Sequence, residues 1–429
     1  MQRINIGLIG LGTVGMGVYK IIHEHQEELR YQTGFKVCIH KVLVRDASKK
    51  RDPMVDMSLL TETADDLLVN PSIDVIIEVA GGIETAYTML RTALDHHKHI
   101  ITANKDLMAI HGAELLSHAK KMQCDFFYEA SVGGGIPIIR SLSDGLSSDK
   151  ITDVLGIING TTNYILTKMD HDGMTYEAAL KKAQELGFAE ADPSSDVGGI
   201  DAGRKMAILA NLAFSMPIDL EDVRVKGIEG LSDIDLAYAK HLGYEMKLLG
   251  IAKIDKGAVE VSVGPTLIPH AHPLTSVHNE YNAVFVRGEA VGTTMFYGPG
   301  AGGLPTATSI VSDVVTVVKN MALGTTGMNI LAPQHKKNLK PRHQIHAKYF
   351  MRLEVIDALG VFSEITGLFA QSGVSFEKII QDPTSEEGLA QIIIVTHDVT
   401  LDQLDATLTS LKTMANVKAV KSYYPIEPV

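Results

Sequence analysis

The chain has 429 residues, of which 45% are hydrophobic and 21% charged, enough apolar material for several packed cores. At roughly 100–200 residues per domain, this length predicts two to four domains. Its 39 lysines and arginines against 51 aspartates and glutamates give a net charge of −12, which argues against nucleic-acid and anionic-membrane partners. Two cysteines, and no apolar run of about 18 residues, predict a cytoplasmic protein without a disulfide framework or membrane span.

The first 135 residues alternate short β-branched runs with helical stretches. Strands are expected at residues 4–9, 35–44, 73–79 and 99–102, and a helix from about residue 15 to 30. Strand–helix alternation of this kind predicts an α/β fold with a parallel, doubly wound sheet covered by helices on both faces.

A glycine motif, Gly10-Leu-Gly-Thr-Val-Gly15, follows the first predicted strand and opens the first predicted helix. Gly10 permits a tight turn, Gly12 lets the backbone approach a pyrophosphate, and Gly15 allows close packing of helix on strand. The sequence therefore predicts a Rossmann-type dinucleotide domain over residues 1–135. Its cofactor loop comprises Gly10, Gly12, Thr13, Val14 and Gly15.

The choice of cofactor depends on the end of the second predicted strand. An acid there would bind a ribose 2′-hydroxyl, whereas an arginine suits a 2′-phosphate. Arg45 lies nearest the strand end, with Lys49, Lys50 and Arg51 behind it, and this favours NADP. Asp46 keeps NAD possible.

Residues 136–304 mix both kinds of element and predict a second, α+β domain. Helices are expected at 138–147, 175–187 and 200–214, and strands at 151–157, 247–254 and 259–263. A second glycine-rich loop, Gly298 to Pro305, precedes a helix at about 305–325 that is expected to complete the first domain. Residues 332–346 are polar and basic with two prolines, which is typical of a linker.

Residues 347–429 form a third predicted unit. Strands at 349–356, 374–380, 391–396 and 417–423 alternate with helices at 362–372 and 400–414. Thr400 and Gln403 make a capping box at the start of the second helix. The order βαββαβ is the ferredoxin-like pattern.

The stretch from Ala183 to Lys205 gathers four carboxylates and one lysine. Asp201 and Lys205 stand at i and i+4, so they share one face of the predicted helix. A surface ion pair is the ordinary explanation of such spacing. The following residues, 206–214, are too apolar for a surface helix, so the charges require partners, and a substrate with an ammonium and a carboxylate would supply them.

Together with this stretch, four further blocks resemble homoserine dehydrogenase: Thr102 to Lys105, Glu129 to Pro137, Ile158 to Ile165 and Gly298 to Pro305. The resemblance covers nearly the whole chain in the right order. It implies NAD(P)-dependent interconversion of L-homoserine and L-aspartate 4-semialdehyde, in threonine, methionine and isoleucine biosynthesis, with residues 136–304 binding substrate and pairing subunits. Because the chain begins at the glycine motif, it resembles the monofunctional form, not the fusion with aspartate kinase.

The resemblance also assigns roles to residues. Lys205 matches the proton-transfer lysine, Lys105 a second lysine between cofactor and substrate oxygen, and Asp201 an aspartate that positions substrate or water. Substrate contacts are implied for Glu190, Asp196, Gly160 and Thr161, and cofactor contacts for Thr102, Lys105 and Gly302. Without the resemblance, Asn159 to Asn163 reads only as a turn.

A monovalent-cation site is implied at the bend after the first domain. Its ligands would be the Glu129 carboxylate and the main-chain carbonyls of Val132, Gly134 and Ile136. Oxygen-only ligands suit a hard cation such as Na⁺, here in a structural role.

The last unit resembles an ACT domain, a ligand-sensing module of amino-acid pathways. Its opening turn, Asp357 to Gly360, has Leu359 where a proline is usual. The resemblance implies an amino-acid effector such as threonine and a homodimer or homotetramer.

Three other interpretations compete with this one. One is another Rossmann oxidoreductase, such as a semialdehyde or hydroxy-acid dehydrogenase. A semialdehyde dehydrogenase that makes an acyl-enzyme would need a nucleophilic cysteine, neither cysteine has a catalytic histidine nearby in sequence, and Lys205 with Asp201 suits alcohol chemistry better. A nucleotide sensor without turnover would not need Lys105, Asp201 and Lys205. Histidines at 96–99 and 270–272 suggest zinc, but neither group has cysteine or carboxylate partners at ligand spacing.

Overall fold

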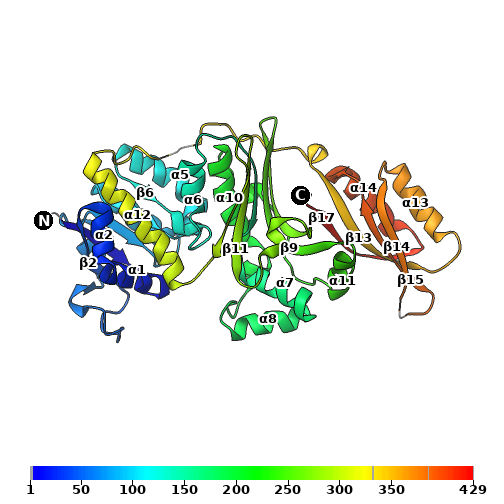
Figure 1. The fold of residues 1–429 in the computed structure, drawn as a ribbon, viewed down its shortest axis with the longest axis horizontal. Helices are drawn as coiled ribbons and strands as arrows, with labels where there is room; N and C mark the ends of the chain where they lie inside the picture. The colour runs from blue at the N-terminus through cyan, green and yellow to red at the C-terminus, as the bar shows by residue number, and fades with distance from the viewer. Residues whose placement is uncertain (1–2, 331–332, 385, 429) are drawn as a thin grey trace. The chain divides into compact units, whose positions relative to one another are not determined.

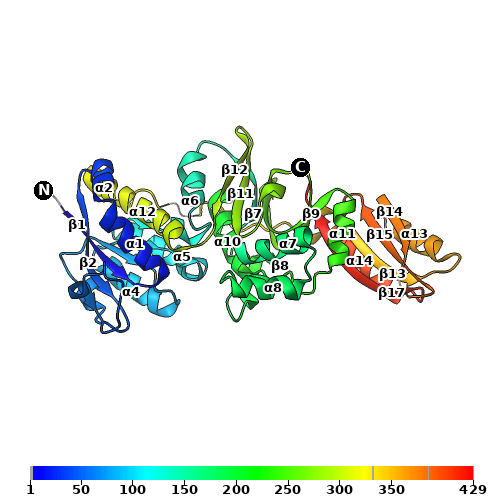
Figure 2. The ribbon, with the colours of Figure 1, turned by 60° about the horizontal axis from the view of Figure 1, so that its bottom comes forward.

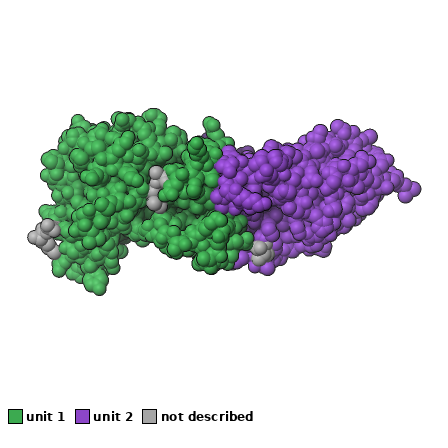
Figure 3. Space-filling model, turned by 90° about the horizontal axis from the view of Figure 1, so that it is seen from above, with its two compact units in different colours: residues 1–160, 201–223, 281–337 green, residues 161–200, 224–280, 338–429 purple. Residues whose placement is uncertain are grey.

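The computed structural model describes residues 3–330, 333–384 and 386–428. The chain forms two compact units, which are coloured separately in Figure 3. Unit 1 comprises residues 1–160, 201–223 and 281–337, and unit 2 comprises residues 161–200, 224–280 and 338–429. No helix within the described residues is long and apolar enough to cross a membrane.

Unit 1 contains the predicted doubly wound sheet, whose strands are all parallel (Figure 1). Its order is β3-β2-β1-β4-β5-β6, which reverses direction between β1 and β4. The strands are β1 (Arg3–Ile9), β2 (Lys36–Leu43), β3 (Leu60–Thr61), β4 (Val75–Glu78), β5 (His99–Thr102) and β6 (Phe126–Phe127). The four predicted strands are confirmed, and the two that were missed have two residues each.

Helices cover this sheet and supply the side chains of its core. They are α1 (Thr13–Glu24), α2 (Gln26–Thr33), α3 (Asp65–Leu68), α4 (Glu84–Asp95), α5 (Lys105–Lys121) and α12 (Gly303–Leu323). The single helix expected at 15–30 is in fact two helices, which meet at His25.

Helix α12 comes from far along the chain and lies beside α1 (Figure 1). Their backbones approach closely, because a Cβ on Gly17 would lie 2.5 Å from the carbonyl oxygen of Gly303. Ile310, Val314 and Val317 of α12 enter the same core cluster as Val18 of α1. The first domain is therefore completed by residues almost 300 positions after its first helix.

The rest of unit 1 includes three neighbouring antiparallel strands of a larger sheet, in the order β12-β11-β7, labelled in Figure 2. Its strands are β7 (Ile151–Ile157), β11 (Tyr281–Gly288) and β12 (Gly292–Pro299), and the helices nearby in sequence are α6 (Ile138–Arg140) and α10 (Ile200–Phe214). The helix expected at 138–147 is only α6 followed by a π-helical turn, Ser141–Gly145. The pair β11–β12 was not predicted.

Unit 2 begins with a helix where a turn was expected. Helix α7 (Gly160–Asp172) includes the polar residues Thr161, Thr162 and Asn163, and all three are buried. The helix replaces the turn that composition alone suggests, because Thr161 and Asn163 bond to other parts of the unit; Asn163 Nδ2, for example, donates to the Asn279 carbonyl oxygen (2.9 Å). The other elements before residue 280 are α8 (Tyr176–Glu185), α9 (Ser194–Val197), β8 (Arg224–Val225), α11 (Asp233–His241), β9 (Tyr244–Asp255) and β10 (Ala258–Pro269).

The C-terminal part of unit 2 has the predicted βαββαβ order. Its elements are β13 (His346–Ile356), α13 (Val361–Gln371), β14 (Phe376–Pro383), β15 (Leu389–Thr396), the short β16 (Val399–Thr400), α14 (Leu401–Thr413) and β17 (Val417–Ile426). The sheet order is β17-β13-β15-β14. The capping box is confirmed, since Thr400 and Gln403 exchange side-chain to main-chain hydrogen bonds of 3.0 and 3.1 Å.

The two faces of this last sheet are covered differently. Alternate residues of β13, such as Met351 and Leu353, pack against α13 and α14. On the other face Arg352 forms a buried ion pair with Asp235 of α11. Ser422 Oγ and Tyr424 OH of β17 also donate to Asp235, at 2.8 and 2.9 Å. Asp235 is thus fully enclosed by three donors.

The segment expected to be a linker is partly paired with β10. The Val259 N–H donates to the carbonyl oxygen of Asn338, and the Lys340 N–H donates to that of Val259. Lys340 Nζ also donates to Glu260 at 3.0 Å. Ala332, the first residue of the expected linker, lies outside the described residues.

Candidate active site

The glycine loop after β1 leaves space at the start of α1. Gly10 has a φ of +96°, and a Cβ there would lie 2.9 Å from the Ala80 backbone. A Cβ on Gly15 would meet the Gly10 carbonyl oxygen at 2.3 Å, whereas one on Gly12 would meet nothing within 4 Å. Thr13, Val14 and Gly15 are the first residues of α1, so their N–H groups have no intrahelical acceptors. The loop can therefore receive a phosphate at the helix N-terminus.

A cavity of about 240 Å³ lies beside this loop, where the strand order of the sheet reverses. Its lining includes Val14 of α1, Gly81 and Gly82 after β4, and Asn104 and Lys105 after β5. Open α/β sheets bind their ligands at such a reversal, outside the carboxyl ends of the strands.

Glu78, at the end of β4, organises one wall of the cavity and was missed by the sequence analysis. Its carboxylate is fully buried and accepts from the N–H groups of Ala80 and Gly81, both at 2.9 Å. It also accepts from the hydroxyl of Thr102 at 2.7 Å. Thr102 Oγ1 in turn accepts from the Asn104 N–H at 3.0 Å. The Thr102 side chain is therefore buried behind the cavity wall. The signal for Glu78 was a single acid within an apolar strand.

At the end of β2 the two charged residues behave differently. Asp46 accepts from the N–H and the hydroxyl of Ser48, at 2.8 and 2.6 Å, and these hydrogen bonds lower its pKa. Arg45 is exposed. The acid is thus engaged in its own turn while the arginine is open to a ligand.

Asp201, near the start of α10, lies between two lysines. Lys205 Nζ donates to its Oδ2 at 2.7 Å, and Lys105 Nζ lies 3.1 Å from its Oδ1. Asn159 Nδ2 also donates to Oδ2 at 2.9 Å, and Lys205 makes a second bond to the Ile158 carbonyl oxygen at 2.8 Å. The predicted catalytic residues therefore form one hydrogen-bonded cluster. Asn159 was missed, because it belongs to a segment that was interpreted as a turn.

The charge state of Asp201 follows from these contacts. Burial by itself would raise the pKa of this carboxyl, since Asp201 is only 5% exposed. The positive charges of Lys205 and Lys105 outweigh burial and hold the pKa of Asp201 well below its usual range. An anion fixed in this way orients both ammonium groups.

Lys105 belongs to both the cavity and the Asp201 cluster. It is the first residue of α5, directly after the N-cap Asn104, whose side chain accepts from the Leu107 N–H at 3.1 Å. The next residue, Asp106, forms an ion pair of 2.9 Å with Arg204 of α10. A reacting group at the cofactor would therefore lie near a cation that is coupled, through Asp201, to Lys205.

The residues expected to hold the substrate lie mainly in unit 2. Thr161 Oγ1 donates to the Phe188 carbonyl oxygen at 2.5 Å and lies 3.3 Å from an Asp196 oxygen. Asp196 is half-buried on α9, and Glu190 is exposed. Gly160 is the first residue of α7. The Asp196 carboxylate beside this hydroxyl offers acceptors for an ammonium group.

The expected cation site surrounds a buried carboxylate in unit 1. Glu129 accepts from the N–H groups of Ile139 and Arg140, both at 2.8 Å. Burial and the nearby charge of Glu129 raise the pKa of Asp313 to about 8, although Arg140 pairs with Asp313 at 2.6 Å. The Glu129 carboxylate, together with carbonyl oxygens at Val132, Gly134 and Ile136, offers the oxygen ligands that suit a hard cation.

The second glycine-rich loop contacts the first one. Gly302, with a φ of +119°, is the N-cap of α12, and a Cβ on the next residue, Gly303, would lie 3.0 Å from the Thr13 carbonyl oxygen. A Cβ on Gly134 would lie 2.4 Å from the Gly300 carbonyl oxygen. Close backbone approach therefore connects this loop to both the cofactor loop and the expected cation site.

A doubly wound sheet with an open glycine loop, beside a Lys–Asp–Lys cluster, defines a dinucleotide-dependent oxidoreductase. Three family models match successive parts of the chain: "Homoserine dehydrogenase, NAD binding domain" over residues 10–129, "Homoserine dehydrogenase" over 137–315, and "ACT domain" over 349–416. The chain belongs to the homoserine dehydrogenase family, and it is an oxidoreductase that acts on a CH–OH group with NAD(P).

Individual relatives agree over the full length. Homoserine dehydrogenase of Bacillus subtilis is 55% identical over 428 residues, covering 100% of this chain and 99% of the relative. The crystal structure of a homoserine dehydrogenase from Thiobacillus denitrificans matches with a TM-score of 0.93 at 35% identity, covering 100% of this chain and 99% of its own. A hyperthermophilic archaeal homoserine dehydrogenase in complex with NADPH matches with a TM-score of 0.63 at 26% identity, covering 74% of this chain and 98% of its own.

Proposed function

We propose that the chain interconverts L-homoserine and L-aspartate 4-semialdehyde with Lys205 as the group that transfers the hydroxyl proton. The supporting observation is the continuous set of contacts from the cofactor cavity through Lys105 and Asp201 to Lys205. NAD(P), when bound, accepts or donates the hydride. In the oxidation, Lys205 takes the proton from the substrate hydroxyl as hydride leaves the same carbon, and in the reduction it returns it.

The remaining residues of the cluster are proposed to position these groups. Asp201 holds both ammonium groups in place, and Lys105 stabilises negative charge on the substrate oxygen during proton transfer. Glu190 and Asp196 bind the substrate's amino group, with contacts from the Gly160 backbone and the Thr161 hydroxyl. Because these carboxylates would bind the ammonium group, substrates that lack it would lose these contacts and bind more weakly.

The test is reduction of NAD(P) with homoserine as substrate, followed by absorbance, on wild type and Asp196→Asn. We expect turnover by the wild type and a KM for homoserine at least tenfold higher in the variant, with kcat less affected. Glu185→Gln, on an exposed residue of α8, is the matched control and should leave both constants unchanged. The absence of turnover with either cofactor would refute the proposed activity.

We further propose NADP as the preferred cofactor, with Arg45 bound to the 2′-phosphate. The open Arg45, the engaged Asp46 and the NADPH in the archaeal relative support this. Thr102 supports cofactor binding indirectly, by holding the cavity wall from behind. Gly302 lets the main chain approach the cofactor. Arg45→Ala should raise the KM for NADP about tenfold and leave that for NAD unchanged, consistent with loss of one charged contact. Equal effects on both cofactors would contradict this assignment.

The other proposals concern structure and regulation. A monovalent cation, Na⁺, binds Glu129 and the carbonyls of Val132, Gly134 and Ile136; replacing Na⁺ by choline should then lower the melting temperature of the wild type but not of Glu129→Gln. We assign the cofactor to residues 1–135 with the helix at 305–325. Substrate binding and the pairing of subunits into a homodimer or homotetramer are assigned to residues 136–304. Residues 332–346 connect this part to residues 347–429, which bind an amino acid such as threonine. Saturating threonine that changes neither activity nor melting temperature would refute that effector.

We also propose a cytoplasmic location, which the two unpaired cysteines favour.

A further inference from the structure

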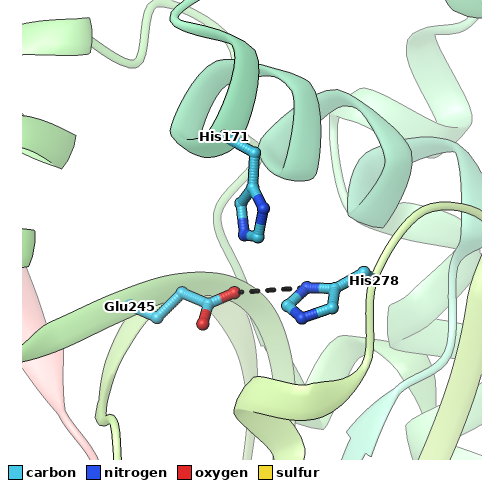
Figure 4. A group of neighbouring side chains, drawn as sticks. All are labelled: His171, Glu245 and His278. Atoms are coloured by element: carbon cyan, nitrogen blue, oxygen red, sulfur yellow. Dashed lines mark ion pairs between the residues drawn. The ribbon is translucent and has the colours of Figure 1, made fainter.

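Unit 2 contains a cluster of metal-ligand side chains for which the dehydrogenase reaction gives no use. His171 comes from the last turn of α7, Glu245 from β9, and His278 from the segment before β11. Each offers a ligand atom within 4.8 Å of the other two. In Figure 4 the His171 ring points from α7 toward the space between the other two side chains. No other group of three such residues was found among the described residues.

The segment that carries His278 is fixed on both sides of this residue. The Val277 carbonyl oxygen accepts from the buried Lys247 at 2.7 Å. The Asn279 N–H donates to Thr167 of α7 at 3.0 Å, and the Asn279 carbonyl accepts from Asn163 of the same helix at 2.9 Å. His278 is therefore held at a set distance from α7 and β9, as a ligand of a preformed site must be.

His278 has a nitrogen that the protein does not satisfy. Its Nδ1 is shielded from solvent and has no hydrogen-bond partner within the described part of the chain. The nearest acid, Glu245 Oε1, is 3.8 Å away, too far for a hydrogen bond. This imidazole nitrogen is therefore open to a metal ion.

Two carboxylates and two lysines surround the cluster. Glu245 Oε1, the oxygen that faces His278, is also paired with Lys247 at 2.7 Å, so a metal ion here would share this carboxylate with Lys247. Asp170 lies 3.4 Å from His171 Nε2 and adds a second carboxylate, partly balanced by the exposed Lys240 at 3.5 Å. A carboxylate beside a ligand histidine fixes the orientation of the ring.

We propose that His171, Glu245 and His278 bind one Zn²⁺ ion that ties α7, β9 and the segment before β11 together. Two imidazoles and one carboxylate form a donor set that Zn²⁺ uses with water in the fourth position. Tetrahedral zinc at about 2.0–2.1 Å from each ligand separates the ligand atoms by about 3.3 Å, so the side chains must close by roughly 1.5 Å at most. His171 can make this movement because its side chain is half-exposed. The role is structural, since the ion adds one link among three segments of unit 2.

The test uses the full-length chain, freed of metal with a chelator and then titrated with Zn²⁺ against a chromophoric competitor. We expect one tight equivalent in the wild type and binding at least tenfold weaker in His171→Ala and in His278→Ala. His96→Ala is the matched control, because this exposed histidine adjoins His97 without a clustered carboxylate, and it should bind as the wild type does.

Two further measurements distinguish a built site from incidental binding. Co²⁺ in place of Zn²⁺ should give the visible absorption of tetrahedral coordination, and His171→Ala should abolish it. Zn²⁺ should raise the melting temperature of the wild type and not of His171→Ala, and excess Mg²⁺ should not displace it. If His278→Ala fails to fold, His171→Ala decides alone. Equal affinity in wild type and His171→Ala, no tight equivalent in the wild type, or displacement by Mg²⁺ would overturn the proposal.

Discussion

Two buried aspartates in this chain have similar burial and opposite chemistry. Asp201 is 5% exposed and Asp235 is 1% exposed, and each bonds to a cation. The cations of Asp201 are lysines, whose side chains remain 13% exposed in Lys205 and 33% in Lys105. The cation of Asp235 is Arg352, which is buried and does not lose its proton. Burial and charge therefore do not by themselves mark a reactive site; an accessible partner able to exchange a proton does.

The largest effect is expected from Lys205→Met, which removes the proton-transfer group. Activity should fall by about 10²–10⁴-fold, with a smaller effect on stability, because Lys105 and Asn159 still contact Asp201. Lys205→Arg should be as inactive, because a guanidinium keeps the charge and cannot release the proton. Steady-state rates and thermal melts of both variants measure this. An active Lys205→Arg protein would show that a positive charge beside Asp201 suffices for catalysis. The proposed difference between the partners of Asp201 and Asp235 would then no longer hold.

Asp235→Asn should give the opposite result, a loss of stability without a loss of activity. Removing the carboxylate leaves Arg352 buried and unpaired, which costs about 3–5 kcal/mol in the free energy of unfolding. Urea unfolding measures this loss, and the rate per folded molecule should match the wild type. Asp233→Asn, on an exposed residue of the same helix, is the control and should cost less than about 1 kcal/mol.

The pH dependence of stability should identify Asp201 as a charged group in the folded state. Its folded pKa is lowered, so its stabilising contribution is present above the unfolded pKa of about 3.9 and is lost as the pH falls through the folded pKa. The difference in unfolding free energy between wild type and Asp201→Asn should therefore be largest near neutral pH and shrink below about pH 4. A difference that is constant from pH 3 to 7 would mean that Asp201 titrates alike in both states.

The smallest effect is expected from Ser422→Ala, which removes one of the three donors to Asp235. Tyr424 and Arg352 remain, and burial together with the Asp235 charge raises the pKa of the Tyr424 phenol, so this phenol stays a donor. The loss should be about 1 kcal/mol in urea unfolding, the usual net value of one hydrogen bond. A loss as large as that in Asp235→Asn would show that the three donors act as one unit.

The sequence predicted the parts of the fold that local patterns determine. β5 was predicted to the residue, because an apolar β-branched run fills the middle of a parallel sheet, and the Thr400–Gln403 capping box marked the start of α14. Helix α7 was missed, because Gly160 to Asn163 has the composition of a turn and becomes helical only through contacts distant in sequence.

The candidate site likewise has one part that local sequence patterns predict and another that they do not. The i, i+4 spacing of Asp201 and Lys205 is local, and their ion pair could be predicted from it. Lys105 lies almost 100 residues earlier, so only family resemblance brought it to the site. Glu78 and Asn159 act through contacts that no local pattern specifies, and neither was predicted.

The packing of α12 against α1 has a consequence for synthesis on the ribosome. The buried residues of α12, which include Ala307, Val311 and Val318, complete a core whose buried residues outside α12 are all made before position 131. Until residue 323 has emerged, the nascent dinucleotide fold exposes the apolar surface that α12 will cover. Such surface binds chaperones and promotes aggregation. Translation must therefore proceed through most of the chain before its first domain can close, although that domain is the first to be made.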